Sequence, residues 1–144
     1  MSISPPPLYE PVVDQDGIAN GSWTLFFNSI FTGDNGTDWT PSFVNLGSTG
    51  TPTITGRYYQ ISGNLVYFRI VVTPATNTTS TAGTTYVENF PLNIRGDGAC
   101  FSLNPSSGVG GTIGVVAAAS GRIFTPSWTA VTVPVIVVGI VEAQ

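Results

Sequence analysis

The chain has 144 residues and a net charge of −4, and only 8% of its residues are charged. It contains no His and no Lys, and its four basic residues are all Arg. This composition excludes coiled coils, and it excludes nucleic-acid binding, which needs a basic surface to neutralise phosphates. It also disfavours most enzymes, because the imidazole and amine groups of acid–base and nucleophilic catalysis are absent.

The length and the hydrophobic content of 42% suffice for one domain with a real core. No apolar run reaches the ~20 residues of a membrane-spanning helix, and residues 1–7 lack the features of a signal peptide. The one cysteine, Cys100, allows no internal disulfide and has the surroundings of a small buried hydrophobe. We therefore expect a protein that is made in the cytoplasm and does not insert into a membrane.

Charge divides the chain into two parts. Residues 1–38 hold five acids and no Arg, a net charge of −5, whereas residues 39–144 hold four Arg and three acids, a net charge of +1. The first part is rich in Pro, and the second is rich in Thr, Val and Gly. We expect an N-terminal arm over residues 1–38 and a β-domain over residues 39–144.

The arm combines an extended Pro-rich lead-in with one short amphipathic helix. Three consecutive prolines favour polyproline II, and Trp, Phe and Ile then recur at i, i+3, i+4, i+7 and i+8. A helix of about ten residues is too short to be stable alone. Its aromatic stripe therefore either packs on the β-domain of the same chain or anchors the arm to another protein. The candidate anchor residues are Pro5, Pro6, Pro7, Leu8, Trp23, Phe26, Phe27, Ile30 and Phe31.

The clearest element of the β-domain is a hairpin. Residues 53–61 and 65–72 predict two strands joined by a three-residue turn that contains Gly63 and Asn64. In the second strand one set of alternate residues is expected to face the core, namely Val66, Phe68, Ile70 and Val72. The opposite face carries Arg69 among apolar residues, which indicates a subunit interface or a binding surface.

Further strands are expected at residues 86–90, 99–103, 113–118, 122–124 and 131–141, with loops at 76–85 and 104–111. The last strand is apolar on both faces, so one face should meet the opposite sheet and the other a neighbouring subunit. Pro134 predicts an edge position or a bulge for this strand. The candidate subunit-interface residues are Arg69, Val135 and Val137. The number of strands is typical of an all-β, antiparallel jelly-roll-like β-sandwich.

Few residues of the β-domain offer catalytic chemistry. Its acids are Glu88, Asp97 and Glu142, and no pattern makes two of them a catalytic carboxylate pair. The acidic segment at residues 14–17 begins like a calcium loop but lacks the ligand at position 12 of an EF-hand. The segment at residues 34–38 is typical of a turn, and the less favoured alternative is a cation held at a trimer axis. We expect no catalytic residue, no metal and no cofactor. One Arg is expected to pair across subunits with Glu88 or Asp97.

Two tryptophans are the candidate receptor-binding residues. Trp39 and Trp128 each sit beside a Thr-Pro pair and outside the periodic strands. Sugars stack on such rings, while neighbouring Ser, Thr and Asn supply hydrogen bonds. The alternative is a place in the core or in an oligomer seam, where large aromatic side chains occur more often.

Several motifs resemble those of a known protein family. Trp39-Thr40-Pro41, the run Gly-Arg-Tyr-Tyr-x-Ile-x-Gly-Asn-x-Val-x-Phe at residues 56–68, and Asn89-Phe90-Pro91 resemble the C-terminal β-domains of tailed-bacteriophage fibres and spikes. Pro-Pro-Pro-Leu-x-x-Pro-Val-Val at residues 5–13, with the Trp/Phe helix after it, resembles the N-terminal anchor of short-tailed phage virion proteins. The resemblance covers residues 39–91 and, more loosely, 1–33.

The resemblance implies a structural virion protein of the short tail fibre type. In such proteins the N-terminal segment binds tail or adaptor proteins, and a homotrimeric β-domain contacts a glycan or protein on the host surface. The expected location is the virion tail, after assembly in the host cytoplasm. No repeat, coiled coil or stalk separates the two parts of this chain, so a capsid decoration or head-fibre protein without a receptor role is the alternative.

Overall fold

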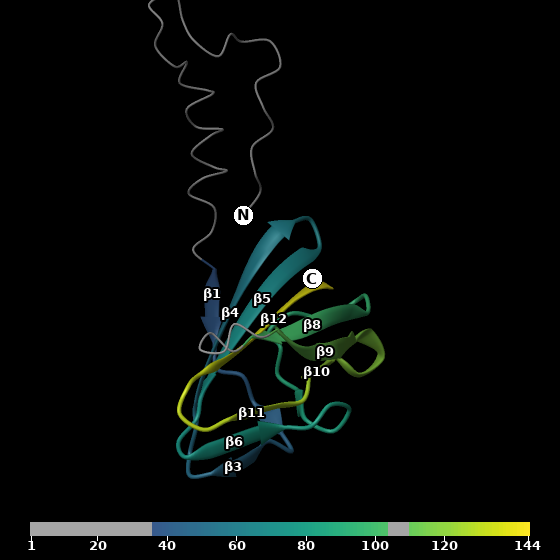
Figure 1. Ribbon diagram of the computed structural model, residues 1–144. Helices are drawn as coiled ribbons and strands as arrows, with labels where there is room; N and C mark the ends of the chain where they lie inside the picture. Colours follow the sequence, from purple (N-terminus) through teal and green to yellow (C-terminus); the bar gives the residue numbers. More distant parts are fainter. Residues whose placement is uncertain (1–35, 104–109) are drawn as a thin grey trace, which may run out of the picture. The chain divides into compact units, whose positions relative to one another are not determined.

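A computed structural model describes residues 36–103 and 110–144 (Figure 1). Within these ranges the protein is built from antiparallel strands and one short 3-10 helix, η1 (Ala118–Ser120), which confirms the predicted all-β class. Residues 1–35 of the predicted arm, which include its helix and the candidate anchor residues from Pro5 to Phe31, lie outside the described residues. The strands are β1 (Thr37–Trp39), β2 (Phe43–Val44), β3 (Gly47–Thr49), β4 (Thr53–Ser62), β5 (Leu65–Thr73), β6 (Asn77–Ser80), β7 (Tyr86–Val87), β8 (Gly98–Leu103), β9 (Gly110–Ala117), β10 (Arg122–Phe124), β11 (Trp128–Ala130) and β12 (Val135–Glu142).

The strands form two sheets. The large sheet has the order β1-β4-β5-β12-β8-β9-β10-β7-β2, and the small sheet has the order β11-β6-β3. In Figure 1 the small sheet lies below the large one. The last strand, β12, is inserted between β5 and β8, so it joins the β4–β5 hairpin to the β8–β9–β10 meander. This position makes β12 the centre of the surface described below.

The core lies on one face of the large sheet, and strict alternation of side chains builds it. On β5 the residues Val66, Phe68, Ile70 and Val72 are fully buried, as the sequence predicts. The antiparallel register places Gly139 of β12 opposite Phe68. A Cβ at Gly139 would lie 2.5 Å from the Phe68 ring, so the absence of a side chain there lets the ring pack against the strand.

Two predictions about the last strand are wrong. Val135 and Val137 are buried in the core, because they pair with Val72 and Ile70, and they do not face a partner. The side chains of β12 that point away from the core are those of the next residues in each case, Ile136 and Val138. Pro134 precedes the strand instead of interrupting it, so β12 keeps all its N–H groups and occupies a central position.

The β-domain begins earlier than predicted. Strand β1 starts at Thr37, and its Asp38 lies opposite Arg57 of β4. Strand β6 occupies part of the segment at residues 76–85 that was expected to be a loop. Both strands are short, and neither has the apolar alternation by which strands are recognised in a sequence.

A chain of buried hydroxyl groups connects the small sheet to the large one. The hydroxyl of Ser80 on β6 lies 2.8 Å from that of Thr125 and donates to the carbonyl oxygen of Pro126 at 2.7 Å. The Thr125 hydroxyl in turn donates to the carbonyl oxygen of Thr85 at 3.3 Å. These polar side chains tolerate burial because each of them has a hydrogen-bond partner. The network fixes the position of the small sheet.

Candidate interaction surface on the large sheet

The large sheet turns a second apolar face away from the core. On β5 this face carries Leu65, Tyr67, Arg69 and Val71, and the register continues it across β12, β8 and β9. Eight large hydrophobic side chains are exposed in the described part of the chain, and six of them lie on this face. We call it the outer face; its residues on the last three of these strands are Ile136, Val138, Ile140, Ala99, Phe101, Leu103, Ile113 and Val115.

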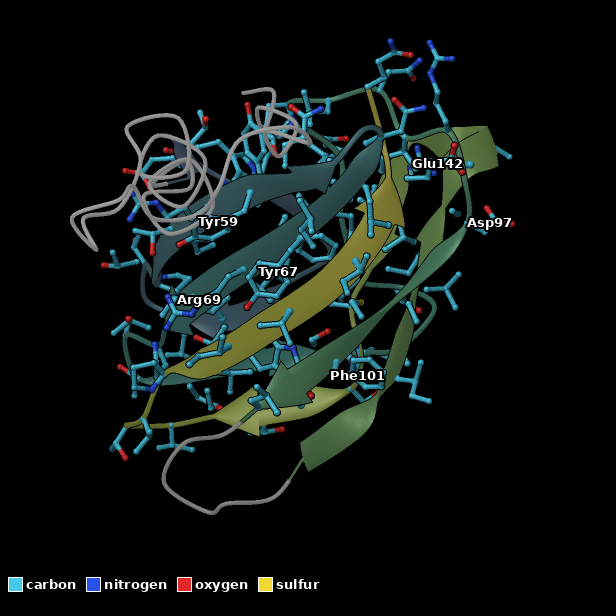
Figure 2. All side chains as sticks on the ribbon, turned by 90° about the horizontal axis from the view of Figure 1, so that it is seen from above. Tyr59, Tyr67, Arg69, Asp97, Phe101 and Glu142 are labelled. Atoms are coloured by element: carbon cyan, nitrogen blue, oxygen red, sulfur yellow. The ribbon has the colours of Figure 1, made fainter. Side chains whose placement is uncertain are left out.

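A shallow hollow of about 350 Å³ lies on the outer face. It forms because Ala99 is small and stands between Ile140 and Val115 in the register, while Tyr67 and Phe101 rise beside it. In Figure 2 Tyr59 and Tyr67 lie on β4 and β5, and Phe101 lies across β12 on β8. The hollow is lined almost wholly by carbon atoms, so it suits an apolar side chain better than a polar ligand.

The few charges of the outer face are unevenly paired. Arg57 contacts Asp38, with Nε 3.1 Å from Oδ1; the Arg57 side chain is partly exposed and that of Asp38 is largely exposed. Arg69 lies directly opposite Arg57 in the β4–β5 register. Among the described residues Arg69 has no ion-pair partner. Like charges that face each other across two strands are unfavourable, so Arg69 is a cation that the described part of the chain does not neutralise.

The acidic groups lie at another edge of the same face, where Figure 2 shows Asp97 and Glu142. The Asp97 carboxylate accepts a hydrogen bond from the backbone N–H of Ala118 at 2.9 Å. The Glu142 side chain is exposed, and its carboxylate forms no ion pair with a described residue. Arg95 is close in space, since its backbone N–H donates to the main-chain carbonyl oxygen of Glu142 at 2.8 Å, but this is a hydrogen bond between backbone groups. The outer face thus carries unpaired charge of both signs at separate places.

The two candidate receptor tryptophans are packed inward. Trp39 lies on β1, with its ring 5.4 Å from Phe90 and 6.1 Å from Tyr58. Trp128 lies on β11, and both rings pack against the core. Neither indole Nε1 is accessible or has a hydrogen-bond partner among the described residues. Both tryptophans therefore lie on strands and not in loops as predicted, and both are half-buried against the core. Their role in receptor binding stays a prediction.

A sequence signal for the position of Trp39 was available at Gly56. A Cβ at Gly56 would lie 2.7 Å from the Trp39 ring and 2.7 Å from Pro41. A glycine inside a strand often marks the close approach of a large group. Gly56 in the hairpin therefore indicated that a group lies close against this strand, but it did not identify that group as the Trp39 ring.

The remaining groups offer little reactivity. Burial raises the pKa of the Cys100 thiol to about 12, so this thiol stays protonated at neutral pH. Within residues 36–103 and 110–144, no group of three or more His, Cys, Asp or Glu residues lies close enough to hold a metal ion. Nor does any helix in this part of the chain have the length and apolar character to cross a membrane.

No protein-family model, no curated protein and no solved structure matches this chain. The outer face is then the most informative feature for function. Broad apolar surfaces of folded domains commonly mark sites of contact with other proteins. Loss of charged residues from the centre of such a surface, with charges kept toward its edges, is typical of protein interfaces.

Proposed function

We propose that this chain is a structural, non-enzymatic bacteriophage virion protein, a short tail fibre. In this proposal the segment that precedes β1 anchors the chain to the tail or its adaptor, and the β-domain forms a homotrimer of jelly-roll-like sandwiches that engages the host surface. The observation that supports it is the outer face, which exposes six large apolar side chains and is suited to assembly with other protein surfaces.

The surface available for host contact is the small sheet with its connections. Residues 45–52, 73–85 and 126–132 contain no charged residue and are rich in Thr, Ser, Gly and Asn. Exposed Ser48, Thr76 and Asn77 lie in this region. Such side chains both donate and accept hydrogen bonds, as recognition of sugar hydroxyls requires. We place the host-contact surface here because the two tryptophans are packed against the core.

The proposal is tested by locating the chain in intact virions. Cryo-electron microscopy of normal virions and of virions that lack this protein gives a difference map. Density around the tail, with the small sheet outward, is the expected result. The purified protein should also adsorb to host cells and reduce infection. The proposal is overturned if the chain is absent from virions.

A second candidate function is capsid decoration without a receptor role. The half-buried position of both Trp39 and Trp128 favours it, because the core covers part of each ring and leaves less of it available to a sugar. Difference density on the capsid lattice would establish this function instead. The purified protein would then stabilise isolated heads and fail to adsorb to cells.

A further inference from the structure

We infer that the outer face of β4, β5, β12, β8 and β9 is the surface through which copies of this chain contact one another. The inference rests on the homotrimer of the proposed function, but that proposal leaves open where the copies meet. Three properties of this face support the inference: its size, the hollow and protruding side chains on it, and its charges.

The size of the outer face suits the centre of a protein interface. Five adjacent strands at a spacing of about 4.8 Å span roughly 19 Å, and Leu65–Val71 extends roughly 20 Å along β5. The projected area is therefore roughly 400 Å², about half of the ~800 Å² that each partner contributes to an interface of ordinary size. The charged and polar positions around it would supply the rim.

The relief of the face favours interdigitation with a protein surface. The hollow at Ala99 is open and apolar, and Phe101, 44% exposed, stands beside it. Ile113 and Val115, at 63% and 54%, are among the most exposed of the large hydrophobic side chains in the described residues. Burial of such side chains on association is favourable in proportion to the apolar area that is removed from water. Such a face would gain stability from a partner whose apolar side chains fill the hollow and whose own surface accepts the protruding ones.

The charges indicate that this partner is a second copy. Arg69 pairs in the register with Val138, four residues before Glu142 on the same strand, and no ion pair joins Arg69 to Glu142 within the chain. An apolar partner would bury both charges without compensation, which is costly. A second copy, rotated relative to the first, offers a carboxylate to Arg69 and a guanidinium to Glu142.

The test uses the full chain and measures its mass in solution by light scattering across a range of concentrations. Phe101→Asp places a charge next to the central strand of the outer face, beside the hollow at Ala99, and should weaken association at least about 100-fold. Val115→Ser is a milder change on the same face and should weaken it about tenfold. Val131→Asp is the matched control, because Val131 is 56% exposed but lies off the face, and this variant should assemble as the wild type does.

A charge exchange tests the choice of partner. Arg69→Glu and Glu142→Arg should each weaken association about tenfold, and the double variant should recover most of the loss. Far-UV circular dichroism and melting curves check that each variant is folded. Both changes are at exposed positions and leave the core intact.

The inference is overturned if the wild-type chain is monomeric at high micromolar concentration, or if folded Phe101→Asp and Val115→Ser proteins assemble normally. It is also overturned if Val131→Asp dissociates the assembly as strongly as Phe101→Asp. A dimer that Phe101→Asp disrupts would support this face and refute the homotrimer. Assembly through this face by a chain that is missing from virions would refute the proposed function and leave the interface standing.

Discussion

Replacing Val137 by Ala tests which face of β12 points into the core. Val137 is fully buried at the centre of the large sheet, opposite Ile70 of β5 on one side and Ser102 of β8 on the other. The substitution removes two methyl groups. Because the backbone is held by ladders of hydrogen bonds on both sides, the resulting cavity can close only in part.

The expected loss of stability follows from these contacts. Deletion of one buried methyl or methylene group costs about 0.5–1.5 kcal/mol, of which about 0.8 kcal/mol is transfer from water. Two groups therefore cost about 1–3 kcal/mol, and the confined central site places Val137→Ala in the upper half of that range. The same substitution at Val131, which is 56% exposed, should change the free energy of unfolding by less than about 0.5 kcal/mol.

Urea denaturation followed by tryptophan fluorescence measures both values. The proteins are compared at one concentration, because the unfolding of an oligomer depends on concentration. Equal losses for Val137→Ala and Val131→Ala would refute the register that places Val135, Val137 and Val141 in the core. So would a loss below about 0.5 kcal/mol for Val137→Ala.

Three further predictions follow from buried contacts. Gly139→Ala should destabilise the fold by about 1–3 kcal/mol, because the new Cβ would lie 2.5 Å from the Phe68 ring, and an unchanged melting temperature would contradict this packing. Ser80→Ala should cost about 1–3 kcal/mol in urea denaturation, because the carbonyl oxygen of Pro126 loses its buried donor at 2.7 Å, and a neutral result would refute this hydrogen bond. Burial raises the pKa of Cys100 from 9.0 to about 12, so the native thiol should resist alkylation at pH 8 and react once urea unfolds the chain. Since the unfolded thiol ionises first, the stability that Cys100 contributes should be complete below pH 9 and fall between pH 9 and pH 12, a fall that Cys100→Ala should remove.

The hairpin was predictable because its signals are local. Val66, Phe68, Ile70 and Val72 alternate with more exposed positions along a strand of nine residues. The turn then needs a residue with positive φ, and Gly63 has φ +51. Both the alternation and the glycine can be read within twenty residues of sequence, so the two strands and the core face were predicted correctly. The turn itself has two residues, Gly63 and Asn64, and not the predicted three, because Ser62 pairs with Leu65.

The small sheet was not predictable, because its stability depends on distant residues. Strand β6 is Asn77–Ser80, a polar segment with the composition of a loop. Its burial depends on partners such as Thr125, which is 45 residues from Ser80 in the chain. The positions of the tryptophans follow from the same kind of distant packing, since Trp39 contacts Phe90 across half of the β-domain. The pattern of residues within a short stretch of sequence does not indicate such distant contacts.

The last strand shows how one sequence feature both concealed the register and created the outer face. Because β12 has Val or Ile on both faces, a shift of one residue changes the buried apolar area little. Gly139 breaks this degeneracy, since only the face that carries the glycine can accept the Phe68 ring. The fit between Gly139 and Phe68 therefore directs the odd-numbered valines inward, and it leaves Ile136, Val138 and Ile140 to face outward. In our proposal this core contact thus also determines which side chains a second copy meets.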